Sequence, residues 1–299
     1  MPSASEVWSV HDASEAVAQA AAGGQRVTID RDGGDVVLSL SRFDQVLEHE
    51  AGDLTCTVEA ATPMTELQAT LAGAGQMLAL DPPGDERLTV GDVFDRGLFG
   101  PRAHRYGRPR DLILGIRARL PGGEEIRGGG KVVKNVAGYD LPKLFTGADG
   151  RLGRLLELTL RLHPLPARTC TLVTATQDAT VFEPLAPACV DYRWAQERLL
   201  VRFEGPVADR LAEQALGLAG GELVEQDEQL WDEQRALQAG LHLHRCLPAD
   251  CSQRVADLRD AGATAVVGRW ARGWLFADLP APERELSPLE QRVIARFAA

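Results

Sequence analysis

The stretch that decides the fold runs from Gly128 to Leu162 and reads GGGKVVKNVAGYDLPKLFTGADGRLGRLLELTLRL. It opens with three glycines, which reach backbone conformations closed to other residues and can turn N–H groups toward an anion. Lys131 and Lys134 follow in a chain that is otherwise acidic. From Leu156 onward, leucines alternate with polar residues in the period-two pattern of a half-buried strand. We expect a glycine-rich loop anchored to a strand, a platform able to hold a large anionic cofactor.

Working outward, length and composition indicate a globular protein. The 299 residues are enough for two domains with separate cores. Hydrophobic residues make up 44% and no apolar run approaches the ~20 residues of a membrane helix. A net charge of -11 disfavours a nucleic-acid surface. The polar N-terminus lacks the pattern of a secretory signal, so we expect a cytoplasmic protein. The five scattered cysteines indicate reduced thiols and form no iron–sulfur motif.

The first half of the chain predicts short strands and a few helices. Asp12 and Glu15 form a capping box that opens a helix ending at Gly23. Thr62 and Pro63 are expected at the N-cap and first position of a second helix, through Leu71. A short helix is expected over residues 139–145. The expected strands are 26–29, 36–40, 54–60, 112–120, 125–127 and 152–162.

The sequence HPLP at residues 163–166 punctuates the chain, and we place a domain boundary near Arg168. Strands and helices alternate beyond it, as in an α+β unit. The expected strands are 171–175, 190–194, 199–203, 241–247, 264–270 and 274–279, of which 190–194 and 199–203 are expected to form a hairpin. The expected helices are 207–218, 229–239 and 249–258.

Two motifs, KVVKNVAGYDLPKLFTGADGRLG and LLELTLRLHPLP, resemble the FAD-binding subunit of bacterial glycolate oxidase. That protein is a flavoprotein of the vanillyl-alcohol oxidase or p-cresol methylhydroxylase type. The likeness extends upstream through residues 54–60, 62–83, 89–91 and 97–115, about half of the chain. It implies an α+β fold in which a p-cresol methylhydroxylase-type FAD-binding domain, residues 1–167, precedes a smaller α+β, ferredoxin-like cap domain, residues 168–299.

The resemblance also implies function: non-covalent FAD, oxidation of a small 2-hydroxy acid, and partner subunits that carry another flavin or an iron–sulfur cluster. The protein would be cytoplasmic, with attachment to a membrane through partners left open. By analogy, 89–91 and 97–100 would follow the diphosphate and 150–154 would pass beside the flavin. The implied cofactor-binding residues are Thr89, Gly91, Gly97, Gly100, Tyr106, Gly107, Lys134, Asn135, Tyr139, Gly150, Leu152 and Gly153. Taken singly, these glycines would only indicate turns. No catalytic base can be named.

Some residues depart from the family pattern. The family's first diphosphate loop should fall near residues 29–36, where this chain has only IDRDGGDV. In the second loop, Asp92 replaces a glycine and Asp95 a small residue. A carboxylate about 4 Å from a phosphate costs ~1 kcal/mol in water-like surroundings and ~4 kcal/mol at an effective dielectric of ~20. The alternative is therefore a paralogue that has lost flavin and serves as a structural subunit of the oxidase complex.

Other polar clusters give weaker signals. His242, His244 and Cys246 alternate on an expected strand and Cys251 follows, which makes a metal site conceivable, but the spacing matches no common zinc pattern. We favour polar residues on the solvent face of that strand and expect no metal. His104 is expected at the surface and His163 in a structural role, while Trp270 and Trp274 are expected in the core and rim of the cap. Binding of another nucleotide has less support, because no complete GxGxxG or Walker-type motif is present.

Overall fold

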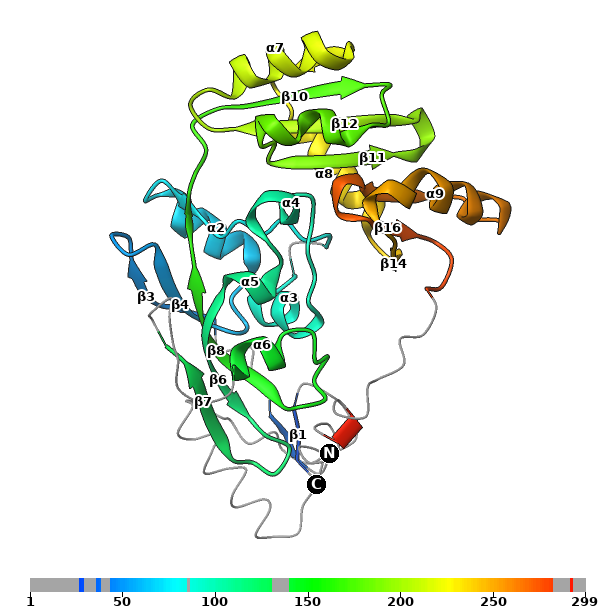
Figure 1. Cartoon of the computed structure of the whole chain (residues 1–299). Helices are drawn as coiled ribbons and strands as arrows, with labels where there is room; N and C mark the ends of the chain where they lie inside the picture. Colours follow the sequence, from blue (N-terminus) through cyan, green and yellow to red (C-terminus); the bar gives the residue numbers. More distant parts are fainter. Residues whose placement is uncertain are drawn as a thin grey trace.

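The computed structural model describes the backbone of residues 27–29 and 36–38, and residues 44–84, 87–130, 140–281 and 291–292 (Figure 1). The expected helix from Asp12 to Gly23 lies outside these ranges. The strands expected at 26–29 and 36–40 are present as β1 (Val27–Ile29) and β2 (Val36–Leu38), which pair in parallel.

A five-stranded antiparallel sheet, in the order β3-β4-β8-β6-β7, forms the centre of the first unit. Its strand β8 carries the predicted leucine alternation, with Leu158 and Leu160 buried, Thr159 half-buried and Arg161 exposed. The strand prediction is confirmed, because only one face of the sheet packs on the core. The strands are β3 (Val46–Glu50), β4 (Thr55–Glu59), β6 (Ile113–Arg119), β7 (Glu125–Gly129) and β8 (Arg154–Arg161).

Helices and a small two-stranded sheet complete this unit. Helix α3 packs on β8, and α6 packs on β6 and β7. Strands β5 (Gln76–Met77) and β9 (His163–Pro164) pair beside α2. The helices are α2 (Met64–Ala72), α3 (Val90–Arg96), α4 (Ala103–Tyr106), α5 (Pro109–Leu112) and α6 (Leu141–Phe145).

Helix α2 begins one residue later than predicted. Pro63 is the N-cap, and the hydroxyl of Thr62, expected to cap the helix, has no hydrogen-bond partner among the described residues. Pro63 instead forms an isolated antiparallel bridge with Thr89, flanked by bonds from Val90 N to Thr62 O and from Met64 N to Leu88 O, both 2.9 Å. This pairing holds the start of α2 extended, so tertiary contacts override the local capping signal.

The second unit is a seven-stranded antiparallel sheet in the order β13-β10-β12-β11-β15-β16-β14. The hairpin and the strand–helix alternation expected here are present. The strands are β10 (Thr169–Thr174), β11 (Cys189–Arg193), β12 (Arg198–Glu204), β13 (Glu222–Val224), β14 (His242–Arg245), β15 (Val266–Arg269) and β16 (Trp274–Ala277), and the α-helices are α7 (Ala208–Ala219), α8 (Glu228–Gln238) and α9 (Cys251–Asp260).

The two faces of this sheet have different partners. Helices α7 and α9 pack on one face, over a core that includes Val190 and Val201. The opposite face meets α8 and the first unit, because Cys189 and Leu200 pack with Trp231 of α8 and Tyr106 of α4. Figure 1 shows α4 directly beneath this sheet.

One buried cluster runs from Cys56 to Leu162 along the chain and a second from Cys170 to Ala277. The boundary predicted at 167/168 falls between them and stays a prediction. The two units touch through a third cluster in which Phe99 packs against Trp274 and Phe276. In the ranges that the structure covers, no helix is both long and apolar enough to cross a bilayer.

Candidate functional site

The first turn of α3 carries two of the predicted cofactor-binding residues, Thr89 and Gly91. Thr89 and Asp92 form a reciprocal capping box: Asp92 N donates to Thr89 Oγ1 and Thr89 N to the Asp92 carboxylate, each at 3.1 Å. Val90 N donates to Thr62 O at 2.9 Å and Gly91 N to Ala60 O at 2.7 Å. All of these N–H groups donate to acceptors within the protein. The start of this helix could therefore contact a ligand through its backbone surface, but it has no free N–H group there to donate to that ligand.

The end of α3 and the 147–150 loop are fastened together by Asp95. Its backbone oxygen accepts from Asp149 N and its Oδ1 from Gly150 N, both at 2.9 Å, while Arg154 lies 3.9 Å from Oδ2. Burial raises the pKa of Asp95, opposed by the Gly150 N–H and by Arg154. The two carboxylates that depart from the family pattern therefore bond to groups of the protein itself: Asp92 caps α3, and Asp95 anchors the 147–150 loop.

This anchor brings Gly97 and Gly150 into one neighbourhood. Gly97 ends α3 in the left-handed conformation, and a Cβ placed on it would lie 3.3 Å from Gly147 Cα. Gly150 also has a positive φ, +71°, and a Cβ placed on it would be in ordinary van der Waals contact with the Arg154 guanidinium and the Asp95 carboxylate, each at 3.8 Å. The packing of the described residues therefore does not require a glycine at position 150, unlike the positions where a Cβ would collide.

Other predicted glycines are required by the protein itself. A Cβ on Gly91 would lie 2.8 Å from Ala60 O, one on Gly100 would lie 1.7 Å from Asp81 O, and one on Gly153 would lie 2.2 Å from Arg119 O. Gly107, at φ +90°, faces Asp111 in the same way, at 2.7 Å. Leu152 is buried in the core of the first unit. The remaining predicted residues, Lys134, Asn135 and Tyr139, lie outside the described residues.

Tyr106 lies at the junction of the two units. Its hydroxyl donates to Glu204 Oε2 of β12 at 2.9 Å, and its ring meets His163 edge-on, with 4.9 Å between centroids. Burial and the neighbouring Glu204 carboxylate raise the pKa of Tyr106. Glu204, which sequence reasoning missed, also accepts from Arg102 Nε at 3.1 Å. The signal was an acidic residue ending the apolar strand sequence LLVRFE.

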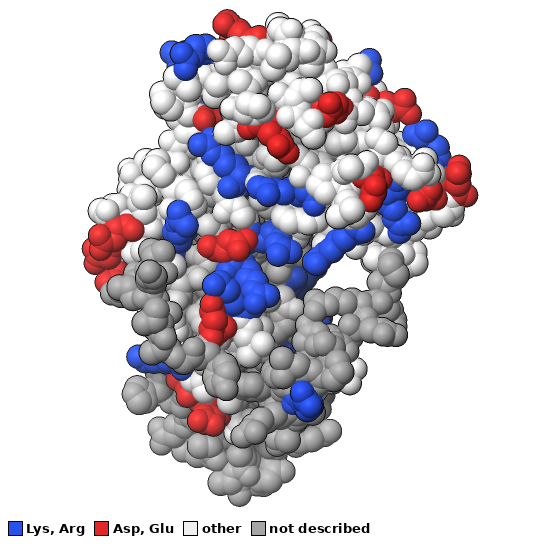
Figure 2. Space-filling model, in the orientation of Figure 1, with Lys and Arg blue, Asp and Glu red and all other residues white. Residues whose placement is uncertain are grey.

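Basic side chains gather near this junction, and Figure 2 shows them across the middle of the molecule, where α4 and α5 lie. Arg105 lies over the ring of Tyr106 and Arg108 over that of Trp274, at 5.6 and 5.2 Å from the centroids. Arg272 donates to the backbone oxygen of His104. Among the described residues, none of these three arginines has a carboxylate within salt-bridge distance, so their charge is available to an anion.

His104, expected at the surface, is instead partly buried at this junction. Burial, with a smaller contribution from Arg272, lowers the pKa of His104 to about 4, so the ring is neutral at pH 7. Its Nδ1 is buried without a hydrogen-bond partner in the described part of the chain. His163, expected to be structural, lies in β9; burial, then Arg161 and Arg105, lower its pKa.

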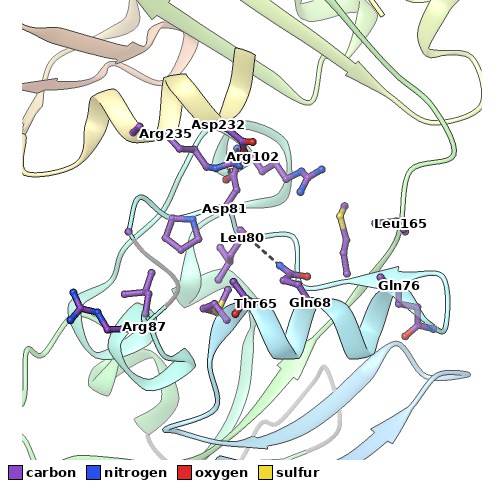
Figure 3. A pocket seen from close by; sticks show the side chains of 17 residues that line it. Thr65, Gln68, Gln76, Leu80, Asp81, Arg87, Arg102, Leu165, Asp232 and Arg235 are labelled. Atoms are coloured by element: carbon purple, nitrogen blue, oxygen red, sulfur yellow. Dashed lines mark hydrogen bonds and ion pairs between the residues drawn. The ribbon is translucent and has the colours of Figure 1, made fainter. Parts of the chain in front are cut away.

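A groove of about 1200 Å³ lies on another side of the junction, between α2 and α8 (Figure 3). Its walls combine apolar side chains such as Leu80 and Leu165 with Asp81 and Arg102, and with Arg235 from α8. Burial raises the pKa of Asp81, whose Oδ1 accepts from Arg102 N at 3.0 Å. None of the twelve predicted cofactor-binding residues lines this groove.

The histidines weighed as metal ligands do not share the predicted solvent face. His242 is exposed, but His244 is only 3% exposed and pairs through Nε2 with Leu279 O at 3.0 Å. The prediction that His244 lies on the solvent face of its strand is wrong, because its ring is buried and bonds to Leu279, which follows β16. In the described ranges, no three His, Cys, Asp or Glu side chains gather as metal ligands do. Trp270 is buried and Trp274 half-buried, as expected of core and rim.

Comparison with known proteins bears on this geometry. Residues 3–129 match the family described as FAD binding domain. The family resemblance is confirmed. The chain is 33% identical over 204 residues to glycolate oxidase subunit GlcE of Escherichia coli (strain K12), covering 64% of this chain and 56% of that protein. It is 34% identical over 140 residues to glycolate oxidase subunit GlcD of Bacillus subtilis (strain 168), covering 47% of this chain and 30% of that protein.

Among solved structures, an alkyldihydroxyacetonephosphate synthase matches with a TM-score of 0.69 at 15% identity, over 97% of this chain and 73% of that one. This likeness concerns the fold alone; together with the match of residues 3–129 to the FAD binding domain family, it confirms the predicted fold class. The chain spans only 56% and 30% of the two glycolate oxidase subunits.

The described residues supply features that FAD binding requires. The cofactor carries an anionic diphosphate, and Arg105, Arg108 and Arg272 offer uncompensated positive charge. It also carries a planar ring that needs close backbone approach, and Gly150 is a residue without a side chain on an anchored loop. The unpaired Nδ1 of His104 is a further polar atom that a ligand could satisfy.

Proposed function

We propose that this chain is an FAD-binding subunit that takes part in flavin-dependent oxidation of a 2-hydroxy acid. The observation that carries the proposal is the Asp95-anchored turn at Gly150 beside α3, where a Cβ would meet no clash, in a chain whose residues 3–129 match the FAD binding domain family. The similarity to two glycolate oxidase subunits supports the substrate class. FAD would be held without a covalent bond, and it would accept a hydride from the α-carbon of the hydroxy acid.

The chain's own residues would hold and orient this group. Residues 1–167 would form the binding domain and residues 168–299 a cap, joined across Tyr106 and Glu204. Asp95 would keep the 147–150 loop rigid, so that Gly150 meets the cofactor without rearrangement. The cations Arg105, Arg108 and Arg272 would attract an anionic phosphate or carboxylate. The twelve predicted cofactor-binding residues remain our assignment, with Gly91, Gly100 and Gly153 acting through the packing they permit.

Partners follow from the same similarity. We propose assembly with other glycolate-oxidase-like subunits, one with a flavin and one with an iron–sulfur cluster, that would accept electrons from this chain. The complex would be cytoplasmic or peripheral to a membrane. The substrate site would then be shared with a partner, in keeping with the lack of an assignable general base.

A second candidate is a structural subunit of the oxidase complex that has lost flavin. The start of α3 favours this second candidate, because the N–H groups of Val90, Gly91 and Asp92 already donate to protein acceptors and are not available to a diphosphate. The two functions differ in one property, which is whether the chain binds FAD.

The test is flavin content combined with a matched pair of variants. The chain is purified alone and with its partner subunits, its visible spectrum is recorded, and flavin released by denaturation is assayed. FAD is then titrated into wild type, Gly150→Asn and Gly75→Asn. Gly150 and Gly75 have φ of +71° and +68°, so backbone strain is the same and asparagine tolerates it. A Cβ on Gly75 would meet no atom within 4 Å, and one on Gly150 would meet Arg154 and Asp95 at 3.8 Å without a clash.

We expect wild type and Gly75→Asn to bind FAD alike and Gly150→Asn to bind at least about tenfold more weakly, a loss of ~1.4 kcal/mol. A wild type that is colourless when purified alone, retains no FAD once excess FAD has been added and the unbound part removed, and adds no flavin to that of its partners in the complex would overturn the flavoprotein proposal in favour of the structural subunit. Equal binding by both variants would show that the Gly150 turn is not at the cofactor.

A further inference from the structure

Two cysteines left out of the proposed flavin site lie next to each other in the second unit. Cys246 follows the end of β14, the short helix η3 (Pro248–Asp250) comes next, and Cys251 opens α9. The two sulfur atoms are 3.7 Å apart. The backbone between them is a compact turn, closed by a bond of 2.9 Å from Asp250 N to Leu247 O. The chain therefore holds two thiols in van der Waals contact.

Joining them requires only a small movement. A disulfide has an S–S length of about 2.0 Å, so the sulfurs must approach by roughly 1.7 Å, which two side-chain rotations can share. The contacts that oppose this are weak thiol hydrogen bonds: Cys246 Sγ to Gly273 O at 3.7 Å and Cys251 Sγ to Trp270 O at 3.3 Å. Among the described residues, neither sulfur forms a hydrogen bond with a charged group that would hold the thiols apart.

The two thiols differ in access, which sets the order of reaction. Cys246 is partly exposed, whereas Cys251 is fully buried. The other three cysteines, Cys56, Cys170 and Cys189, are also buried, each at most 1% exposed. Reagents in solution therefore meet Cys246 first, and Cys251 is the only thiol placed to resolve what forms there.

We propose that Cys246 and Cys251 form a reversible dithiol–disulfide site whose oxidising reactants are low-molecular-weight disulfides. The Cys246 thiolate attacks one sulfur of the reagent, whose S–S bond breaks as a mixed disulfide forms and one thiolate leaves. The Cys251 thiolate then attacks Cys246 Sγ and releases the second half of the reagent. The two protein protons end on the two released thiols, so the protein is oxidised by two electrons and the reagent is reduced.

Burial makes the thiol–disulfide exchange slow at neutral pH, because it raises the pKa of both cysteines and leaves little thiolate. At pH values below the pKa of Cys246, the reaction rate should increase about tenfold for each unit by which the pH is raised. The site also lies close to the unit junction. A Cβ on Gly273 would lie 2.0 Å from Cys246 O, and the residues on either side of Gly273 contact His104 and Arg108. The site stands independently of the proposed function.

The test uses the full chain, reduced and freed of reductant, incubated with oxidised glutathione at pH 8. Free thiols are counted under denaturing conditions, and peptides are mapped by mass spectrometry without reduction. We expect the five thiols to fall to the three buried ones, a disulfide to link the peptides of Cys246 and Cys251, and dithiothreitol to restore all five. Cys251→Ser should stop at the glutathione adduct on Cys246, and Cys246→Ser should not react.

Cys170→Ser is the matched control, because it removes a buried thiol from another part of the same unit and should leave the reaction unchanged. Two results would overturn the proposal. One is wild-type protein that stops at the glutathione adduct or keeps five thiols. The other is a disulfide that maps to a different pair. Both are read from wild type, so they hold even if the Cys251 variant folds poorly.

Discussion

Replacing Glu204 with glutamine tests the junction between the two units. The Glu204 side chain has no exposed surface, and it accepts from Arg102 Nε and Nη2 at 3.1 and 3.0 Å and from the Tyr106 hydroxyl at 2.9 Å. Burial opposes the charge on Arg102, but Glu204 and Asp81 outweigh it and raise the pKa of the guanidinium. Glutamine keeps the shape and removes the charge, so Arg102 is left without its carboxylate.

Breaking a buried ion pair from one side costs about 3–5 kcal/mol. The Arg102 side chain keeps 17% exposure and Asp81 nearby, so we take the lower end, about 3 kcal/mol. For a chain of 299 residues, with an unfolding entropy of about 2.1 cal/mol/K per residue, that loss lowers the melting temperature by roughly 5 °C. Tyr106→Phe removes one neutral donor to the same carboxylate and should cost about 1–2 kcal/mol.

The assay is urea and thermal unfolding of wild type, Glu204→Gln, Tyr106→Phe and the double variant. The double variant should lose less than the sum of the two, because both side chains act through one carboxylate. Glu233→Gln is the control: its carboxylate pairs with Arg193 at 3.3 Å but is 53% exposed, so we expect a loss below about 1 kcal/mol. If Glu204→Gln unfolds with the same free energy as Glu233→Gln, the reasoning about this junction is refuted.

Three further predictions concern single residues. Gly100→Ala should destabilise the chain by more than about 3 kcal/mol in denaturant unfolding, because its Cβ would collide with Asp81 O, while Gly122→Ala, with open space, should change stability by less than about 0.5 kcal/mol; equal effects would show that Gly100 is not needed for packing. Because the pKa of folded His104 is about 4 against 6.5 for the free side chain, the unfolded chain binds its proton first as the pH falls, so stability is full above 6.5 and declines down to about 4. The free energy of unfolding of wild type should therefore be lower at pH 5 than at pH 7, and in His104→Phe this drop should be smaller by up to about 2 kcal/mol. An equal drop in both proteins would contradict the lowered pKa of His104. Thr89→Ala removes the cap of α3 and should cost about 1 kcal/mol, a loss that Thr89→Ser should largely restore in the same unfolding assay.

Local patterns predicted much of the fold. The leucines of β8 needed only period-two alternation, because one face of that strand is buried. Strands β11 and β12 were predicted as a hairpin from their short apolar sequences, and all of their residues except Arg198 are buried, because both faces of their sheet are covered. The start of α2 was missed by one residue, since the bridge between Pro63 and Thr89 joins segments that the sequence keeps apart.

The site was harder to predict, because its residues act through distant neighbours. Gly100 looked like a cofactor contact, but its missing side chain makes room for Asp81 O, nineteen positions earlier. Asp95 looked like a source of repulsion, but it anchors Gly150, fifty-five positions later. Glycines and carboxylates in a family motif therefore indicate the fold before they indicate the ligand. Substituting Gly91 or Gly153 would test packing as much as cofactor binding, which is why Gly150 and Gly75 are the better pair.

The claim on which the account depends is that this chain binds FAD. Equilibrium dialysis of the purified chain, alone and in complex with its partner subunits, against a series of FAD concentrations measures this directly. The account predicts saturable binding that approaches an equimolar amount of FAD and weakens in Gly150→Asn. The account would be contradicted if the total FAD concentration were the same on both sides of the dialysis membrane, for the chain and for the complex.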